Sequence, residues 1–308
     1  MLYILVIVLF VYILSIILFN YTCQKSKIDE EKMNKSLNKI KDKYKEKIME
    51  AIVAINKFEK EEVEIKSSDG LLLKGHLIKG KSKNIIICCH GYHSCYQFDF
   101  SIGGMNYLKK GYSVLFLDQR AHQDSKGVFT TFGVKECYDL KKWIEFINNK
   151  YKDSKILLTG ISMGASTVMY SLGLKLPKNV VGAVCDCGFT RPIEVIKHTA
   201  NKMIPYCGGI IAFLINLGSI FCTGKSLAKI STKRTLKENT IPLMILHGTS
   251  DKVVPVEMGR LNNQYNKESK AKIKKYVEIE GAGHGMSFLV DEKKCSEELD
   301  DFLKKINF

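Results

Sequence analysis

A serine flanked by glycines is the strongest chemical signal in this sequence. The motif GISMG spans residues 160–164, after the apolar run 155–159 and before a segment with helical character. A tight turn from strand to helix leaves no room for a side chain at either glycine, and it exposes the serine hydroxyl at the head of the helix. The motif therefore predicts Ser162 as a nucleophile. The alternative is a serine that only caps a helix after a glycine turn.

A carboxylate and a histidine follow two later apolar runs. Asp251 ends the motif HGTSD after the run 242–246, and His284 ends the motif GAGH after the run 273–279. Serine is a weak nucleophile at neutral pH, so an imidazole must take its proton and a carboxylate must hold that imidazole in the right tautomer. The chain order therefore predicts a triad of Ser162, Asp251 and His284. Asp186, which also follows an apolar run, is the alternative acid.

Two backbone amides are candidates for an oxyanion hole, the donors that stabilise the negative oxygen formed on attack. The motif HGY at residues 90–92 follows the apolar run 84–89, where the chain must turn. The N–H groups of Tyr92 and of Met163, the residue after the nucleophile, are the natural pair. We expect His90 and His93 to be structural hydrogen-bonding groups rather than catalysts.

The candidate residues lie just after short apolar runs, and this indicates how the chain positions them. Eight such runs occur between residues 62 and 279, and the first two flank the turn signal Ser-Asp-Gly and predict a hairpin. The later runs alternate with helix-like segments near 97–110, 134–150, 163–176, 255–267 and 291–306. This alternation predicts an α/β fold with a mostly parallel eight-stranded sheet covered by helices on both faces. Ligands bind at the carboxyl ends of strands in such sheets.

The motifs in this order resemble the serine hydrolases of the α/β-hydrolase superfamily. The similarity is greatest to bacterial membrane-anchored hydrolases of the Bem46/ABHD and prolyl-oligopeptidase-like groups. The matching segments lie between about residues 61 and 306 and read SSDGLLLKGHLI, CCHGYHS, LDQRAHQDSKG, GISMGAS, VCDCGF, ILHGTSDKVVP and GAGHGMS.

The resemblance implies the α/β-hydrolase fold and assigns the same residues as the spacing does. It implies Ser162 as nucleophile, Asp251 as acid and His284 as base, with oxyanion donors at Tyr92 and Met163. One departure is visible: where relatives usually show R-G-H-G-x-S, residues 120–125 of this chain read RAHQDS. The departure leaves the shape of this loop open but does not bear on the mechanism.

A long insertion separates the apolar run ending at Cys185 from the run that begins near Pro242. A simple crossover needs about a dozen residues, and members of the superfamily place a helical cap here, which predicts a cap at about 190–237. Residues 203–224 carry no charge. A second membrane crossing there would strand the run 242–246 away from its sheet. We therefore expect apolar cap helices that form an acyl-binding pocket or contact a bilayer surface, the alternative being an ordinary buried helix pair.

The first residues predict a membrane anchor. Residues 2–19 are apolar except for Ser15, and the first charged side chain is Lys25. At ~1.5 Å per residue this stretch reaches about 27 Å, close to the ~30 Å of a hydrocarbon core. A positive segment before the apolar run and a small-residue cleavage site are both missing, which favours an uncleaved transmembrane helix at 1–24 over a signal peptide.

The segment that follows indicates orientation. Basic residues cluster just after the apolar helix, at Lys25, Lys27, Lys32, Lys35 and Lys39. The positive-inside rule therefore predicts a single-pass protein with its catalytic domain, residues 61–308, on the cytoplasmic side. Residues 25–60 carry apolar side chains at positions 40, 44, 48, 52 and 55, a spacing that predicts a charged amphipathic linker helix. This helix would bind anionic headgroups or pack on the catalytic domain as a spacer.

Composition limits the classes of protein. The 308 residues are 45% hydrophobic and 26% charged, which excludes a disordered chain and allows a core without disulfides. The ten cysteines lack regular spacing, so we expect free thiols rather than a disulfide framework or zinc site. The net charge of +15 is dispersed, and no nucleic-acid-binding motif occurs. No metal or dissociable cofactor is implied.

These observations together predict a membrane-anchored serine hydrolase. Its expected reaction is cleavage of a carboxylic ester, lipophilic rather than short or charged, through an acyl-enzyme. The expected partners are a small-molecule or lipid ester and the membrane, and nothing indicates the oligomeric state. A serine peptidase of the same fold is the alternative, because the same triad cleaves amides. A catalytically silent binding module is a third possibility.

Overall fold

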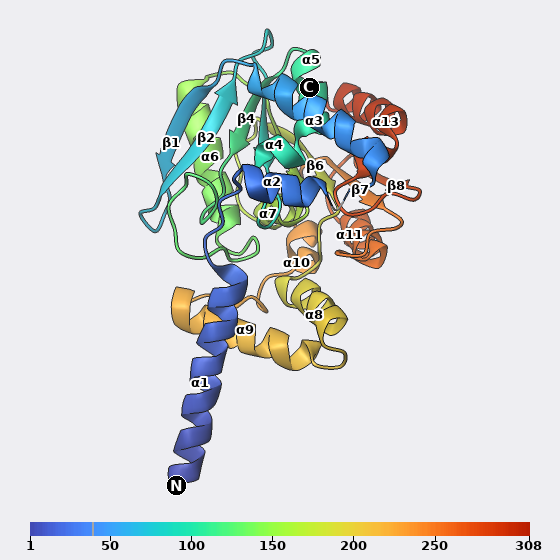
Figure 1. Cartoon of the computed structure of the whole chain (residues 1–308). Coiled ribbons are helices and arrows are strands. Elements are labelled where there is room, and N and C mark those ends of the chain that lie inside the picture. The colour runs from blue at the N-terminus through green and yellow to red at the C-terminus, as the bar shows by residue number, and fades with distance from the viewer. Residues whose placement is uncertain (39) are drawn as a thin grey trace.

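The computed structural model describes residues 1–38 and 40–308, so Lys39, one of the lysines behind the predicted orientation, lies outside the described residues. The described residues form one eight-stranded sheet in the order β1-β2-β4-β3-β5-β6-β7-β8 (Figure 1). The strands are β1 (Glu61–Lys66), β2 (Leu72–Ile78), β3 (Ile85–Cys89), β4 (Ser113–Leu117), β5 (Ile156–Ile161), β6 (Val180–Asp186), β7 (Leu243–Gly248) and β8 (Lys274–Ile279). All eight predicted strands are present.

Strand pairing confirms the predicted fold class. β1 and β2 form the expected antiparallel hairpin, whose turn contains Gly70 at a φ of 86°. β2 is antiparallel to β4, and every other neighbouring pair from β4 to β8 is parallel. The central strands β3 and β4 are buried along their whole length, which explains why their sequences are continuously apolar rather than alternating.

Helices cover both faces of the sheet. One face packs against α6 (Glu136–Lys150), α7 (Met163–Ser171), α10 (Thr232–Lys237) and α11 (Val256–Lys267). The other face packs against α3 (Asp42–Asn56), α4 (Tyr96–Asp99), α5 (Ser101–Lys109) and α13 (Glu292–Lys305). Each face buries one hydrophobic cluster, so the sheet lies between two apolar layers.

The N-terminal segment contains three helices. α1 (Leu2–Cys23) is the helix in the described part of the chain that is long and apolar enough to cross a membrane, a property shared by anchors and signal sequences. The predicted linker helix is two shorter helices, α2 (Glu30–Leu37) and α3. α3 packs against α4 and α5, with Ile55 buried in the core of the sheet. The helix α3 therefore packs on the α/β domain.

The long insertion after β6 contains α8 (Pro192–Met203), α9 (Gly208–Thr223) and α10. Figure 1 shows α9 crossing α1 at the end of the domain from which α1 projects. The two helices approach closely at Gly218, where an added Cβ would lie 2.2 Å from the carbonyl oxygen of Ser15. The rings of Tyr12 and Phe221 also meet edge to face, with 4.8 Å between their centroids.

Candidate active site

The turn between β5 and α7 has no room for side chains beside Ser162. An added Cβ at Gly164 would lie 1.9 Å from the carbonyl oxygen of Cys89, and one at Gly160 would lie 2.3 Å from the carbonyl carbon of Gly164. Ser162 itself has a φ of 56° and a ψ of −117°, a conformation that costs a non-glycine residue about 1–3 kcal/mol. The turn holds the serine at the head of α7, as the motif predicts.

The structure brings Ser162, His284 and Asp251 into one hydrogen-bonded line. His284 Nε2 lies 2.8 Å from Ser162 Oγ, and His284 Nδ1 lies 2.7 Å from Asp251 Oδ2. When Nδ1 donates its proton to the carboxylate, Nε2 of a neutral imidazole presents a lone pair to the serine hydroxyl. The arrangement can therefore remove a proton from Ser162.

Asp251 is held as an anion by its surroundings. Its Oδ1 accepts the N–H groups of Val253 at 2.8 Å and Val254 at 2.9 Å. Burial alone would raise the pKa of Asp251, but the nearby His247 and His284 outweigh burial and hold this pKa well below its usual value. His247 also braces the loop, because its Nε2 lies 2.9 Å from the carbonyl oxygen of Val254. The carboxylate is therefore charged at neutral pH.

The alternative acid, Asp186, has a different partner. It ends β6, and its Oδ1 accepts a hydrogen bond from Ser287 Oγ at 2.8 Å. Ser287 begins α12 (Ser287–Val290), a short helix that the sequence did not indicate. Burial raises the pKa of Asp186. Geometry therefore favours Asp251 over Asp186 as the partner of His284.

The two predicted oxyanion donors belong to segments beside Ser162. Met163 is the first residue of α7, so its N–H points out of the helix N-terminus and has no partner within the helix. Tyr92 follows Gly91, where an added Cβ would lie 3.4 Å from Ser162 Cβ. The two backbone segments therefore flank the serine, as an oxyanion hole requires.

His90 and His93 bond to the backbone in the same region. Nδ1 of the buried His90 lies 2.8 Å from the carbonyl oxygen of Gly91, and its Nε2 accepts the N–H of Gln119 at 3.1 Å. Burial lowers the pKa of His90 to about 4. His93 stacks on Tyr92, with 3.9 Å between ring centroids. Both histidines therefore make contacts that support the loop carrying Tyr92.

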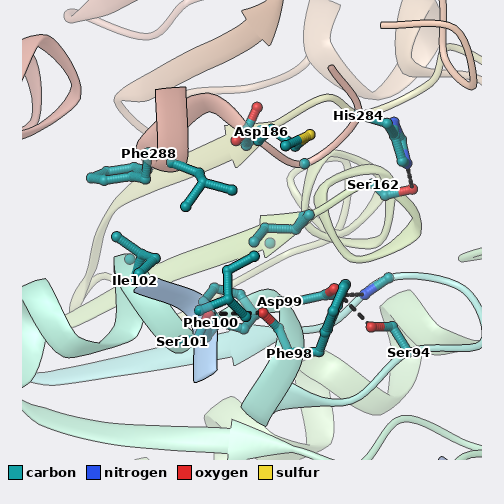
Figure 2. A pocket seen from close by; sticks show the side chains of 18 of the residues that line it. Ser94, Phe98, Asp99, Phe100, Ser101, Ile102, Ser162, Asp186, His284 and Phe288 are labelled. Carbon is teal, nitrogen blue, oxygen red and sulfur yellow. Dashed lines mark hydrogen bonds between the residues drawn. The ribbon is translucent and has the colours of Figure 1, made fainter. Parts of the chain in front are cut away.

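Asp99 is a site residue that the sequence did not indicate. Its Oδ2 accepts the N–H of Gly91 at 2.5 Å, and its Oδ1 accepts the hydroxyl of Ser94 at 2.7 Å (Figure 2). These two bonds fix both ends of the loop that carries Tyr92. The sequence did not indicate Asp99 because this residue lies in a helix-like segment without a motif, eight residues after Gly91.

A cavity of about 320 Å³ opens at Ser162 and His284. Figure 2 shows these two residues at one end and Ile102 and Phe288 toward the other. Its lining is mainly apolar and comes from the α4–α5 region, from α12 and from the N-terminal segment, including Phe98, Phe100, Ile102, Phe288, Leu289, Ile28, Met33, Ile40 and Ile48. The N-terminal segment thus forms part of the wall.

The expectation that residues 203–224 form an acyl pocket is wrong. None of the described residues that line this cavity lies between 190 and 237. The physical reason is that α9 packs on α1 and α8 instead, with Gly218 allowing the close approach to Ser15. Phe213, which would face an acyl chain under that expectation, is 58% exposed.

The loop after β4 holds the N-terminal segment in place. The N–H of Ser26 donates to the carbonyl of Ala121 at 2.9 Å, and the N–H of Gln123 donates to the carbonyl of Ser26 at 3.0 Å. The side chain of Gln123 accepts the N–H of Ile28 at 2.6 Å. Ala121 and Gln123 have φ values of 56° and 43°. They stand where the resembling family shows glycine, so the loop keeps a left-handed backbone without it.

One group near the triad has the donor atoms of a metal site. Ligand atoms of Cys187, Asp251 and His284 lie within 4.8 Å of one another. Both ring nitrogens of His284 already face Asp251 and Ser162. Burial raises the pKa of Cys187 well above its usual value, which disfavours the thiolate that a metal binds. Hydrogen bonding accounts for this cluster better than metal ligation does.

Comparisons with known proteins agree with this architecture. The family pattern for the alpha/beta hydrolase fold matches residues 84–206. The uncharacterised protein YqkD of Bacillus subtilis is 25% identical over an alignment of 267 positions that covers 82% of each chain. The Pyrococcus furiosus esterase Pf2001 is 28% identical, with a TM-score of 0.64 over 80% of this chain and 93% of that one.

A Pyrococcus horikoshii acylaminoacyl peptidase shares the fold alone. It is 17% identical, with a TM-score of 0.61 over 80% of this chain and 41% of the peptidase. This chain therefore has the α/β-hydrolase fold. It is structurally similar to an esterase, and peptidases share its fold.

Proposed function

We propose that this chain is a serine hydrolase that cleaves carboxylic esters with apolar acyl chains and is held at a membrane by α1. The observation that carries the proposal is the hydrogen-bonded line from Ser162 through His284 to Asp251, opening on an apolar cavity. The similarity to an esterase over most of both chains supports the same reaction class.

The reaction proceeds in two halves. Ser162 Oγ attacks the ester carbonyl while its proton passes to His284 Nε2, and Asp251 stabilises the resulting imidazolium. The amides of Tyr92 and Met163 donate to the oxyanion. The imidazolium returns its proton to the leaving alcohol, which leaves an acyl-enzyme. Water, deprotonated by His284, then releases the acid and restores the hydroxyl of Ser162.

The cavity supports an apolar acyl group as the preferred substrate part. The described residues of its wall include phenylalanine, isoleucine and methionine side chains but no lysine or arginine that would pair with a charged acid. Each methylene removed from water contributes about 0.8 kcal/mol, or roughly fourfold in affinity. We therefore expect kcat/KM to rise with acyl length until the cavity is full.

The helix α1 supports attachment to a membrane. Its 22 residues extend about 33 Å at ~1.5 Å per residue, enough for a hydrocarbon core of ~30 Å. The lysines that follow support a cytoplasmic position for the catalytic domain. Retention of the chain in the membrane pellet after carbonate extraction tests the anchor, and protection of the domain from external protease tests the side.

Two assays test the enzymatic proposal. A fluorophosphonate probe should label the wild-type chain, since it reacts with activated serines, and the absence of labelling would favour a silent binding module. Values of kcat/KM for p-nitrophenyl esters with two to twelve carbons should then rise with length. A flat series together with turnover of peptide amides would replace the esterase proposal with the peptidase alternative.

A further inference from the structure

The helix α9 exposes an apolar face. From Met203 to Gly224 the chain carries no charged residue, yet the side chains of Ile210, Phe213 and Phe221 are 65%, 58% and 50% exposed. Met203, Ile204 and Tyr206, which lead into α9, are also exposed. Contiguous exposed apolar surface of this kind marks a site of interaction with a protein or a membrane.

This face is continuous with the apolar surface of α1. The two helices touch at Tyr12 against Phe221 and at Ser15 against Gly218, and Phe19 is fully buried. Figure 1 shows α9 lying across α1 with the first half of α1 extending beyond it. Any layer that accepts the exposed side chains of α1 therefore meets α9 at the level of Tyr12–Phe19.

The length of α1 decides how deep α9 must lie. Residues 2–10 are all exposed and span about 14 Å, less than half of a hydrocarbon core of ~30 Å. The rest of the core must come from the second half of α1, beside α9. Since a helix is about 10 Å thick, α1 crosses the core only if α9 lies inside the same apolar layer.

We propose that α9 is embedded in the leaflet nearest the catalytic domain, with Ile210, Phe213 and Phe221 among the acyl chains. The proposal rests on the proposed attachment through α1. Exposed lysines flank the helix, at Lys202 before it and at Lys225 after it, in position for anionic headgroups. The occupant of the apolar face is therefore a lipid bilayer, and α1 and α9 together form one membrane-bound unit.

Depth-dependent quenching of tryptophan fluorescence tests this proposal. The full chain is reconstituted into vesicles of phosphatidylcholine and phosphatidylglycerol, with the phosphatidylcholine brominated along its acyl chains. The single native tryptophan, Trp143, is buried in the domain core and gives the baseline. Phe213→Trp reports on α9 and Phe10→Trp on α1. Val53→Trp is the matched control, because Val53 is 56% exposed on α3, away from α9 in Figure 1.

The three variants separate the inference from the anchor on which it rests. We expect bromolipid to quench the added fluorescence of Phe213→Trp and Phe10→Trp, and to leave that of Val53→Trp unchanged. Quenching of Phe10→Trp without quenching of Phe213→Trp would overturn the inference and leave the anchor intact. That result would indicate a protein cover for α9, such as a second copy of the chain. Quenching of neither would overturn both proposals.

Discussion

The loops at the strand ends and the N-terminal segment both contribute to the candidate site, but they are positioned by different means. Ser162, Asp251 and His284 follow strands of one sheet, and short glycine-containing turns fix them locally. Ile28 and Met33 reach the cavity because hydrogen bonds join residues 26–28 to a loop about a hundred residues later in the chain. Local turns therefore set the positions of the three triad side chains, whereas long-range contacts set the position of the N-terminal part of the cavity wall.

The largest effect should follow removal of the nucleophile. Ser162→Ala is expected to lower kcat by about 10⁶ and to abolish fluorophosphonate labelling, because no other group replaces the attacking oxygen. The thermal unfolding midpoint should not fall, because the substitution removes no contact of the hydrophobic core. Labelling that persists in this variant would assign the nucleophile elsewhere.

The acid should come next. Asp251→Asn is expected to lower kcat by about 10⁴, the loss seen when an asparagine leaves the histidine of a serine-protease triad in the wrong tautomer. Asp186→Asn is the matched control, because this buried carboxyl bonds to Ser287 rather than to His284. Steady-state kinetics on one ester compares the two variants, and a reversed order of severity would identify Asp186 as the acid.

A substitution in the wall of the cavity should have an intermediate effect, on substrate preference. Met33→Asp should remove the preference for long acyl chains, an advantage of about two orders of magnitude for four methylenes, and should spare acetate esters. Phe213→Asp, on the exposed face of α9, is the control and should leave the preference unchanged in detergent. The ratio of kcat/KM for hexanoate and acetate esters, which differ by four methylenes, measures this. A lost preference in Phe213→Asp alone would restore the cap helices as the pocket.

Asp99 should act through the Tyr92 loop. Asp99→Ala is expected to lower kcat by about tenfold, less than the ~10²–10³ of losing an oxyanion donor outright, because the loop loosens but keeps its amide. KM should change little. Asp99→Asn retains a side-chain oxygen for the Gly91 N–H and should recover part of kcat. Equal losses in both variants, with a raised KM, would indicate a role in substrate binding instead.

The smallest effect concerns the end of α1. The sequence alone predicts near-normal activity on small esters after deletion of residues 1–24. In the structure, however, the carbonyl of Thr22 accepts the hydroxyl of Tyr92, and the carbonyl of Cys23 accepts the N–H of Thr130 at 2.8 Å. Each bond contributes about 0.5–1.5 kcal/mol to the stability of the segments that it joins. Loss of these bonds should loosen the loop that carries Tyr92, so we expect kcat/KM on p-nitrophenyl acetate to fall by up to about tenfold. Unchanged kinetics would show that the anchor is catalytically neutral.

Patterns that depend on near neighbours could be predicted from the sequence. Strand–helix alternation indicated the sheet, and the glycines at 160 and 164 indicated the turn that carries Ser162. The order of Ser162, Asp251 and His284 predicted the three side chains that the structure joins by hydrogen bonds. Their catalytic roles remain proposals.

The partners of the apolar helices could not be predicted, because hydrophobicity indicates burial but not the surface that covers it. Ile48 and Ile55 lie on one helix, yet the first lines the cavity and the second enters the core of the sheet. Gly218 signals a close approach of two backbones, but its partner, Ser15, is two hundred residues away. For the same reason the uncharged run 203–224 suggested a pocket that other segments form.

The pinning of residues 24–28 bears on which substrates can reach the active site. A flexible tether of 36 residues, the length of segment 25–60, would let a domain wander about 33 Å from its anchor point. In this chain, hydrogen bonds join Ser26 and Ile28 to the loop after β4. The domain is therefore held within a few residues of the end of α1. With α1 in a membrane, as proposed above, Ser162 would work at one fixed height above the lipid surface and in one orientation. Such an enzyme would scan the two dimensions of its membrane rather than the surrounding volume, and its turnover in cells would follow the surface density of its substrate.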